Sequence, residues 1–239
     1  MDSKTDPDSN DSLKAKIAAL SEFGHAVVHD LKAPLRHIVT YTGMLEGIYV
    51  DKLDENGRKF LSRLSVNAAR AQQLIDRLLQ YAEAEESKGP SEDADLEAVA
   101  ATAITGLEEV IHEAGARVTV GALPHIRTRR EDVLMVLDIL IENALTYRGA
   151  ASPEINLTSE DLGEKIEISV ADNGPGVSEE YREMIFQPFK RLHSRDEIEG
   201  TGLGLAIARR LVERNGGRIG MRQNAPVGAI FYFTLPKNP

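Results

Sequence analysis

Two long helical patterns near the N-terminus most constrain how this chain can fold. Apolar residues recur at steps of three and four over 12–47 and again over 55–86, which is the spacing of one buried face on an α-helix. The short turn between them predicts an antiparallel helical hairpin. One hairpin cannot cover both apolar faces, whereas two hairpins form a four-helix bundle. The sequence therefore predicts a homodimer through the hairpin.

A histidine lies on the first predicted helix, away from its apolar face. Val27 and Leu31 mark that face, and His29 is two residues from each of them. A neutral imidazole nitrogen is a nucleophile. Asp30 could hold the opposite ring nitrogen or accept a proton from it. Taken alone, His29 is more simply interpreted as a surface histidine, so its meaning depends on motifs further along the chain.

Composition and charge exclude several function classes. The chain has 239 residues, enough for one or two domains, and its net charge of -10 argues against a nucleic-acid or anionic-membrane surface. The absence of cysteine excludes disulfides and thiolate metal sites. No apolar run approaches the ~20 residues of a membrane span. We expect no membrane contact in this segment, a cytoplasmic location and a disordered lead-in over 1–11.

The remainder of the chain predicts a second domain. An acidic segment with Gly and Pro over 87–94 is the expected linker, followed by a domain over 95–239. Helical patterns occur over 96–112, 130–147 and 203–215, with a short helix capped by Ser178. Strand patterns occur over 117–120, 154–159, 165–171, 218–222 and 229–235. Because these patterns do not alternate strictly, we expect an α+β sandwich.

Two glycine clusters in this domain are suited to a nucleotide. Asp172 ends an apolar strand, and its carboxylate could accept a hydrogen bond from an amine such as that of adenine. Gly174 and Gly176 follow and permit close backbone approach. The second cluster runs into a helix, where free N–H groups favour phosphate. Either cluster alone could be a plain turn. The second comprises Gly200, Thr201, Gly202, Leu203 and Gly204.

Two further groups could assist a nucleotide. Asn143, on the helix over 130–147, offers an amide oxygen to a hard cation such as Mg²⁺, and Glu142 lies beside it. Basic residues between the glycine clusters, including Lys190 and Arg191, could form a lid over phosphates. A solvated run of charge is the alternative interpretation of that segment.

In their order along the chain, these motifs resemble a bacterial sensor histidine kinase of two-component systems. The motifs are H-D-x-x-x-P-L from His29, N-A from Asn143, D-x-G-x-G from Asp172, F-x-P-F from Phe186 and G-T-G-L-G-L from Gly200. The H-D-L form and residues 189–196 resemble the phytochrome-type branch. The resemblance implies a dimerisation and histidine phosphotransfer domain over 12–86. It also implies a catalytic ATP-binding domain of the Hsp90-like ATPase type over 95–239.

The resemblance further implies a role for each matched residue. His29 would be the phosphoacceptor and Asp30 its general base. Asp172 would recognise adenine, Asn143 would bind Mg²⁺, and Glu142 would orient the metal's water. Gly202 and Gly204 would bracket the phosphates, and the nucleotide pocket would also include Lys190, Arg191 and Tyr147. The implied reaction is Mg-ATP-dependent autophosphorylation. Transfer to an aspartate of a response regulator would follow.

Three positions depart from the family pattern. Ile139 replaces an earlier asparagine, and Thr146 stands where a basic residue is common. These two leave open an alternative, a phosphotransfer or docking module with a degenerate nucleotide domain. Another open possibility is an ATPase of the same superfamily that clamps a dimer. Ala33 replaces the Thr or Asn of relatives with phosphatase activity, which predicts weak or absent phosphatase activity. The input signal and the regulator's identity do not follow from the sequence.

Overall fold

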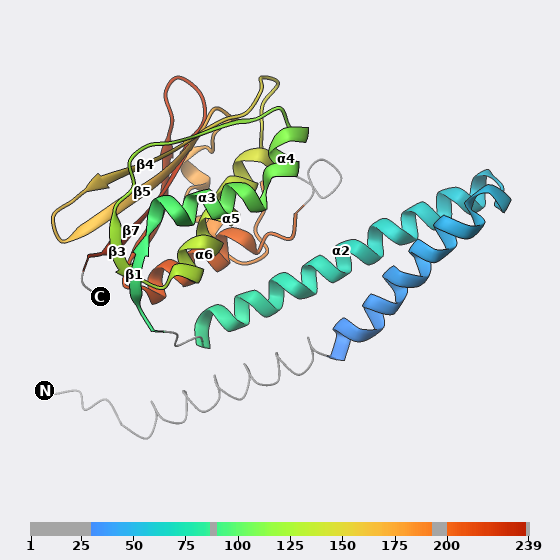
Figure 1. Ribbon diagram of the computed structural model, residues 1–239. Coiled ribbons are helices and arrows are strands. Elements are labelled where there is room, and N and C mark those ends of the chain that lie inside the picture. The colour runs from blue at the N-terminus through green and yellow to red at the C-terminus, as the bar shows by residue number, and fades with distance from the viewer. Residues whose placement is uncertain (1–29, 87–89, 193–199, 238–239) are drawn as a thin grey trace, which may run out of the picture. The chain divides into compact units, whose positions relative to one another are not determined.

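The computed structural model describes residues 30–86, 90–192 and 200–237 (Figure 1). The chain divides into two compact units between Glu83 and Ala84, and each is described by itself. His29, the predicted lead-in over 1–11 and the start of the first predicted helix lie outside the described residues. Within the described part of the chain, no helix combines the length and apolarity that crossing a membrane requires.

The N-terminal unit is the predicted helical hairpin. A helix over 30–49 leads through the short 3-10 turn η1 (Val50–Lys52) into α2 (Glu55–Glu86), and the two helices lie side by side in Figure 1. An ion pair joins them, with the Lys32 ammonium 2.7 Å from an Asp76 carboxylate oxygen. The buried side chains of this unit include Thr42 on the first helix and Ala68 and Ile75 on α2, which are small or apolar. The hairpin prediction is therefore confirmed.

Much of the apolar surface of this hairpin remains uncovered in a single chain. Phe60 is 66% exposed and Leu64 50% exposed, both on α2. The exposed apolar residues of the helix over 30–49 are Leu31, Ile38, Tyr41, Met44, Leu45, Ile48 and Tyr49. Contiguous apolar surface of this kind marks an interaction face.

The C-terminal unit is built on a mixed five-stranded sheet in the order β2-β4-β5-β7-β6. The strands are β2 (Arg117–Val120), β4 (Glu154–Asp161), β5 (Lys165–Asp172), β6 (Arg218–Gln223) and β7 (Ala229–Pro236). β2 pairs with β4 in parallel, and every other pair is antiparallel. Alternate residues of β4 and β7 are buried, so one face of the sheet forms the core.

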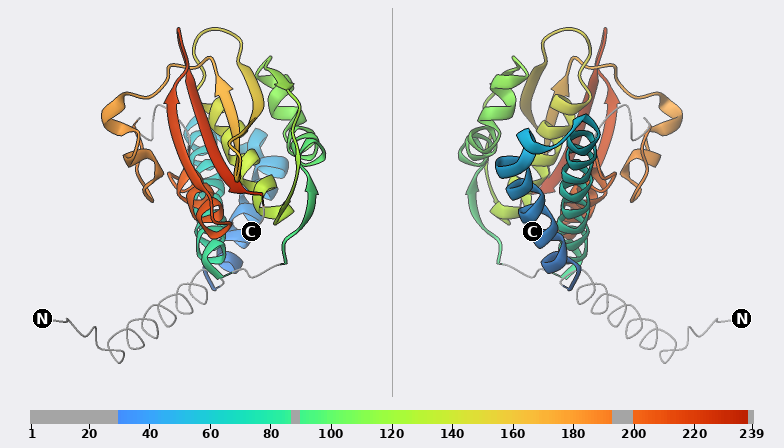
Figure 2. Two further views of the ribbon diagram at one scale, coloured as in Figure 1. Left: turned by 90° about the vertical axis from the view of Figure 1, so that its left-hand side faces the viewer. Right: turned by 90° about the vertical axis from the view of Figure 1, so that its right-hand side faces the viewer.

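Helices pack against that face of the sheet (Figure 1 and Figure 2). They are α3 (Leu96–Gly106), α5 (Arg130–Thr146) and α6 (Gly204–Arg214). The short α4 (Glu108–Glu113) follows α3 and has no buried residue. Leu140 and Ile141 of α5, Ile207 of α6 and Phe233 of β7 are all inaccessible to solvent. The result is the predicted α+β sandwich, with α5 and α6 leading towards the candidate site. Short 3-10 turns occur at η2 (Glu179–Tyr181) and η3 (Met184–Phe186).

The structure differs from the sequence predictions at three places. β1 (Glu92–Asp95) begins inside the segment expected to be a linker and pairs with β3 (His125–Thr128), which was not predicted. The helix expected over 96–112 is broken at Leu107, directly after Gly106, the poorest helix former of that segment. Ser178 precedes only the 3-10 turn η2, and its side chain makes no capping hydrogen bond.

Candidate nucleotide-binding site

Three segments that are distant in sequence meet at the candidate site: the end of α5, the loop after β5 and the start of α6. A Cβ atom placed on Gly174 would lie 2.6 Å from the carbonyl oxygen of Tyr147. One placed on Gly204 would lie 3.4 Å from Cγ2 of Ile139. Such close approach needs glycine at Gly174. The structure thus brings both glycine clusters against the helix that carries Asn143.

Asp172, at the end of β5, is buried and held by backbone groups. Its Oδ1 accepts hydrogen bonds from the N–H of Gly174 at 2.8 Å and of Ala229 at 3.0 Å. Burial raises the pKa of this carboxyl group above its ordinary value, and the bonds from Ala229 and Gly174 act in the opposite direction. Within the described residues, no hydrogen bond reaches Oδ2 of Asp172. This oxygen is suited to accept a bond from a ligand.

The hairpin between β6 and β7 supports Asp172. Its two strands were predicted from the sequence, but this contact was not. The Asn224 side-chain amide donates to the Asp172 carbonyl oxygen at 2.8 Å. Gly228 lies so close that an added Cβ would meet that same oxygen at 1.9 Å. Asp172 is 52 or more residues away from Asn224 and Ala229, so no local sequence pattern reveals these contacts. The one sequence signal is Gly228, a glycine between two strand patterns.

Asn173, between Asp172 and Gly174, stabilises the scaffold. Its Oδ1 accepts the N–H of Glu154 at 2.9 Å, and its Nδ2 donates to the carbonyl oxygen of Ser152 at 3.0 Å. These bonds fasten the loop after β5 to the start of β4. They leave the Asp172 side chain to face the site.

The second glycine cluster is fixed by the segment before it. Gly202 has a φ of 72°, and its carbonyl oxygen accepts the N–H of Phe189 at 2.8 Å. The Arg191 guanidinium donates to the Gly200 carbonyl oxygen at 2.9 Å. Lys190 is exposed beside it. Arg191 therefore holds the loop, and the other predicted basic residues, from residue 193 onwards, lie outside the described residues.

Two residues of this cluster have local roles. The Thr201 hydroxyl accepts the N–H of Leu203 at 3.3 Å. Leu203 is completely buried, so its side chain packs in the core and cannot contact a nucleotide. The sequence grouped Leu203 with the nucleotide-binding residues because of its place in the motif.

Asn143 and Glu142 are half-buried near the C-terminal end of α5, and Tyr147 caps that helix through its N–H to the Asn143 carbonyl oxygen at 2.9 Å. The described residues contain no cluster of three His, Asp or Glu side chains that could hold a metal. A single amide oxygen fits Mg²⁺ that takes its other ligands from phosphates and water. Ile139 is 3% exposed and packs against Gly204, whereas Thr146 is exposed.

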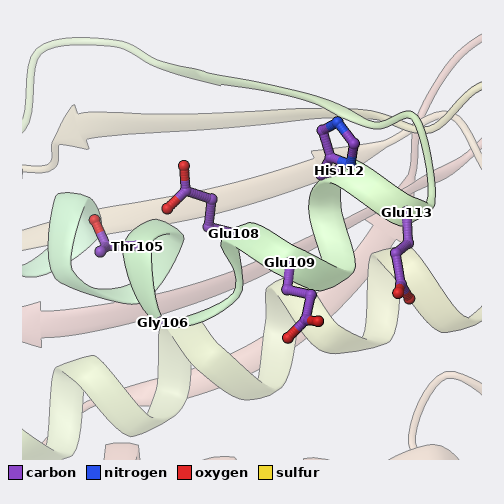
Figure 3. Close-up of a pocket in the computed structure, with 6 residues that line it drawn as sticks. All are labelled: Thr105, Gly106, Glu108, Glu109, His112 and Glu113. Atoms are coloured by element: carbon purple, nitrogen blue, oxygen red, sulfur yellow. The ribbon is translucent and has the colours of Figure 1, made fainter.

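A separate surface pocket of about 620 Å³ lies at the junction of α3 and α4 (Figure 3). Its lining includes Glu108, Glu109, His112 and Glu113, and none of the predicted site residues. Three carboxylates would repel a triphosphate. This pocket is therefore not the nucleotide site.

The predicted phosphoacceptor region belongs to the other unit. Asp30 is the first described residue of its helix and is exposed, as is Ala33. His29 lies outside the described residues, so its geometry relative to Asp30 stays a prediction.

Comparisons with known proteins match both units. Residues 19–87 match the family model "His Kinase A (phospho-acceptor) domain". Residues 128–239 match "Histidine kinase-, DNA gyrase B-, and HSP90-like ATPase". Phytochrome-like protein Cph1 of Synechocystis is 33% identical over 225 residues, which cover 94% of this chain and 30% of that protein. The chain thus spans about a third of this relative's length.

Two solved structures share the fold. Full-length ShkA in complex with AMPPNP aligns with a TM-score of 0.72 and 25% identity, covering 90% of this chain and 45% of that one. The histidine kinase ThkA in complex with the response regulator protein TrrA aligns with a TM-score of 0.65 and 24% identity, covering 100% of this chain and 69% of that one. In this chain the residues that match the phosphoacceptor model precede those that match the ATPase model. The chain belongs to the sensor histidine kinase family, and its relatives include the phytochrome-type branch.

Proposed function

We propose that this chain is a sensor histidine kinase core that transfers the γ-phosphoryl group of ATP to His29 and then to an aspartate of a response regulator. The observation that carries the proposal is the buried Asp172 carboxylate, with one oxygen fixed by two backbone N–H groups. It lies in an ATPase-family domain, and the matched phosphoacceptor domain that contains His29 precedes it.

In this proposal the adenine amine donates to Asp172, and the backbone at Gly174 and Gly176 follows the base closely. Tyr147 lines the pocket. The phosphates face the loop before α6, where N–H groups and the helix dipole favour negative charge. The loop residues concerned are Gly200, Thr201, Gly202 and Gly204, with Leu203 contributing only backbone, and Lys190 and Arg191 add positive charge.

Asn143 would hold Mg²⁺ through its amide oxygen, and Glu142 would orient a water of the metal. When bound, Mg²⁺ supplies positive charge that offsets the charge on the β- and γ-phosphates. Asn143 fits this role because its side chain is half-buried at the end of α5, beside the loop that contains Gly174.

The chemical step is an in-line displacement at phosphorus. A ring nitrogen of His29 attacks the γ-phosphorus, a P–N bond forms, and the bond to the bridging oxygen breaks to release ADP. Asp30 accepts the proton from the opposite ring nitrogen, which leaves a neutral phosphorylated imidazole. The regulator's aspartate then displaces the imidazole and takes the phosphoryl group. Because the two reacting groups lie in different units, the linker must let them meet.

Two protein partners belong to the proposal. A second copy of the chain would cover the exposed apolar face of the hairpin, giving a homodimer. A response regulator would dock where its aspartate can reach His29. The ThkA structure, which contains a response regulator protein, supports a partner of this kind. Use of ATP supports a cytoplasmic location.

The test is incubation with γ-labelled Mg-ATP, followed by acid treatment. The unaltered chain should take up label that is stable to base and released by acid, as expected for a phosphorylated imidazole. The His29→Ala variant should take up none. His37→Ala is the matched control, because His37 is an exposed histidine only eight residues further along the chain, and it should be labelled normally. Acid-stable label, or label retained by His29→Ala, would contradict the proposal.

A further inference from the structure

Asp172 is held by the hairpin between β6 and β7 at both its backbone and its side chain. Asn224 donates its amide to the Asp172 carbonyl oxygen at 2.8 Å, and Ala229 donates its N–H to Oδ1 at 3.0 Å. On the other side, the N–H of Gly174 reaches the same Oδ1 at 2.8 Å. The position of this carboxylate is therefore set jointly by its own loop and by the hairpin.

The shape of the hairpin turn is fitted to this contact. The N–H of Asn224 donates to the Gly228 carbonyl oxygen at 3.0 Å, which closes the turn. Gly228 has a φ of 118° and lies directly on the Asp172 carbonyl, where any side chain would collide. A Cβ on Gly176 would also meet the Gly228 carbonyl oxygen, at 2.9 Å. The turn thus packs on both ends of the loop 172–176.

The tip of the turn differs from its base. Val227 is 54% exposed, whereas Gly228 and Ala229 are buried and Asn224 is half-buried. The side-chain amide of Asn224 donates its hydrogen bond to a backbone carbonyl that is 52 residues away in the sequence. The buried part of the turn consequently faces Asp172, and the tip at Val227 offers a nearby control position.

The orientation of Asp172 decides which base it can accept. With Oδ1 occupied by two N–H donors, Oδ2 is the oxygen presented to a ligand. A carboxylate oxygen accepts a bond from the 6-amino group of adenine. It repels the 6-oxo group of hypoxanthine or guanine, because the carboxylate oxygen and the 6-oxo oxygen are both hydrogen-bond acceptors. Discrimination therefore depends on holding Oδ2 in place.

We propose that Asn224 is a positioning residue for nucleobase specificity, which acts through Asp172 to favour adenine over 6-oxopurine nucleotides. This inference rests on the proposed function, because it requires Asp172 to contact the base. Loss of the Asn224 amide leaves the Asp172 carbonyl without this donor and allows the end of β5 to shift. The carboxylate then loses its fixed orientation, and the contact with the 6-amino group weakens.

The test compares the affinities of ATP and inosine triphosphate in the same chain. Asn224→Ala should weaken ATP binding about fivefold, the effect of one lost hydrogen bond. Inosine triphosphate binding should hardly change, so the ratio of the two affinities falls. Asn224→Asp keeps the shape of the side chain without its N–H donors, and it should lower the ratio at least as much. Val227→Ala should leave both affinities unchanged.

Each other outcome has a definite meaning. Equal weakening of both nucleotides, or no change in either, would overturn the positioning role while leaving the proposed function intact. If the unaltered chain binds no ATP, the proposed function fails, and this inference fails with it. Thermal unfolding of each variant shows whether it is folded, and Asn224→Asp replaces Asn224→Ala if the alanine variant does not fold.

Discussion

At the scale of single residues, the Asp172 carboxyl group is subject to two opposing effects. Burial raises its pKa above the ordinary value of 3.8, and the N–H groups of Ala229 and Gly174 oppose that rise by stabilising the ionised form. The net shift is upward. Asp172 therefore takes up a proton at a higher pH than an exposed aspartate does.

This shift predicts an acid limb in nucleotide binding. If Asp172 binds adenine as proposed, ATP affinity should fall as the pH is lowered through the raised pKa, because protonation removes the charged acceptor for the adenine amine. The loss should begin above the range expected for a carboxyl group with a pKa of 3.8. ATP titrations at a series of pH values would show it. A midpoint at or below 3.8 would contradict the role given to Asp172.

The same pKa shift also affects the stability of the fold: ionisation of Asp172 favours ATP binding but disfavours the folded state. Since the folded pKa exceeds the unfolded value, ionisation of Asp172 disfavours the folded state. This penalty is absent below pH 3.8 and complete above the folded pKa. Asp172→Asn should consequently be a weak ATP binder that is at least as stable as the parent near neutral pH. A variant much less stable than the parent at that pH would show that the carboxylate is needed for folding.

At the scale of elements, the periodicity of apolar residues predicted the helices and strands that bury one regular face. The apolar repeat predicted α2 and α5, and alternation predicted β4 and β5, because each buries one regular face. β1 and β3 were not predicted, because the sequence of β1 (Glu-Asp-Ala-Asp) is untypical of a strand and β3 pairs only with β1. The site was predictable where motifs carry it, as at Asp172. Asn224 was not, because its role comes from a contact made only in the folded chain.

A buried ion pair joins α5 to α6 at the ends remote from the site. Both Asp132 carboxylate oxygens accept bonds from the Arg214 guanidinium, and Oδ2 also accepts the Asn215 amide at 2.7 Å. The side chains of Asp132 and Arg214 are only 10% and 13% exposed. Because Asn143 lies on α5 and Gly204 begins α6, this network maintains the spacing of two parts of the site.

Asp132→Ala should lower the free energy of unfolding of the C-terminal unit by about 3 kcal/mol, since it leaves a buried guanidinium without its carboxylate. Arg209→Ala is the control. Its ion pair with Glu213 is 40% and 53% exposed, so its loss should cost below about 1 kcal/mol. Hydrogen exchange of peptides from α5 and α6 separates this unit from the hairpin. Equal protection in both variants would argue against the network.

At the scale of the whole molecule, the exposed apolar face of the hairpin predicts self-association. Replacing Phe60 and Leu64 together with Glu places two charges on that face, and burying them in an interface is strongly unfavourable. The double variant should be monomeric by light scattering at concentrations where the parent is dimeric. Lys59→Glu, an exposed neighbour that is already polar, should remain dimeric. A dimeric double variant would place the interface elsewhere.

The short interval between α2 and β1 has a consequence for the kinetics of phosphorylation. Only six steps along the chain separate Glu86 from Glu92, so even a fully extended chain allows a span of about 20 Å. Lys32 is paired with Asp76, ten residues before Glu86, or about 15 Å along the helix. A tether of this length holds the two units of one chain at an effective concentration in the millimolar range or above, whatever the concentration of the protein. The hairpin and the nucleotide domain therefore need no affinity for each other, and dilution of the dimer should leave the phosphorylation rate unchanged.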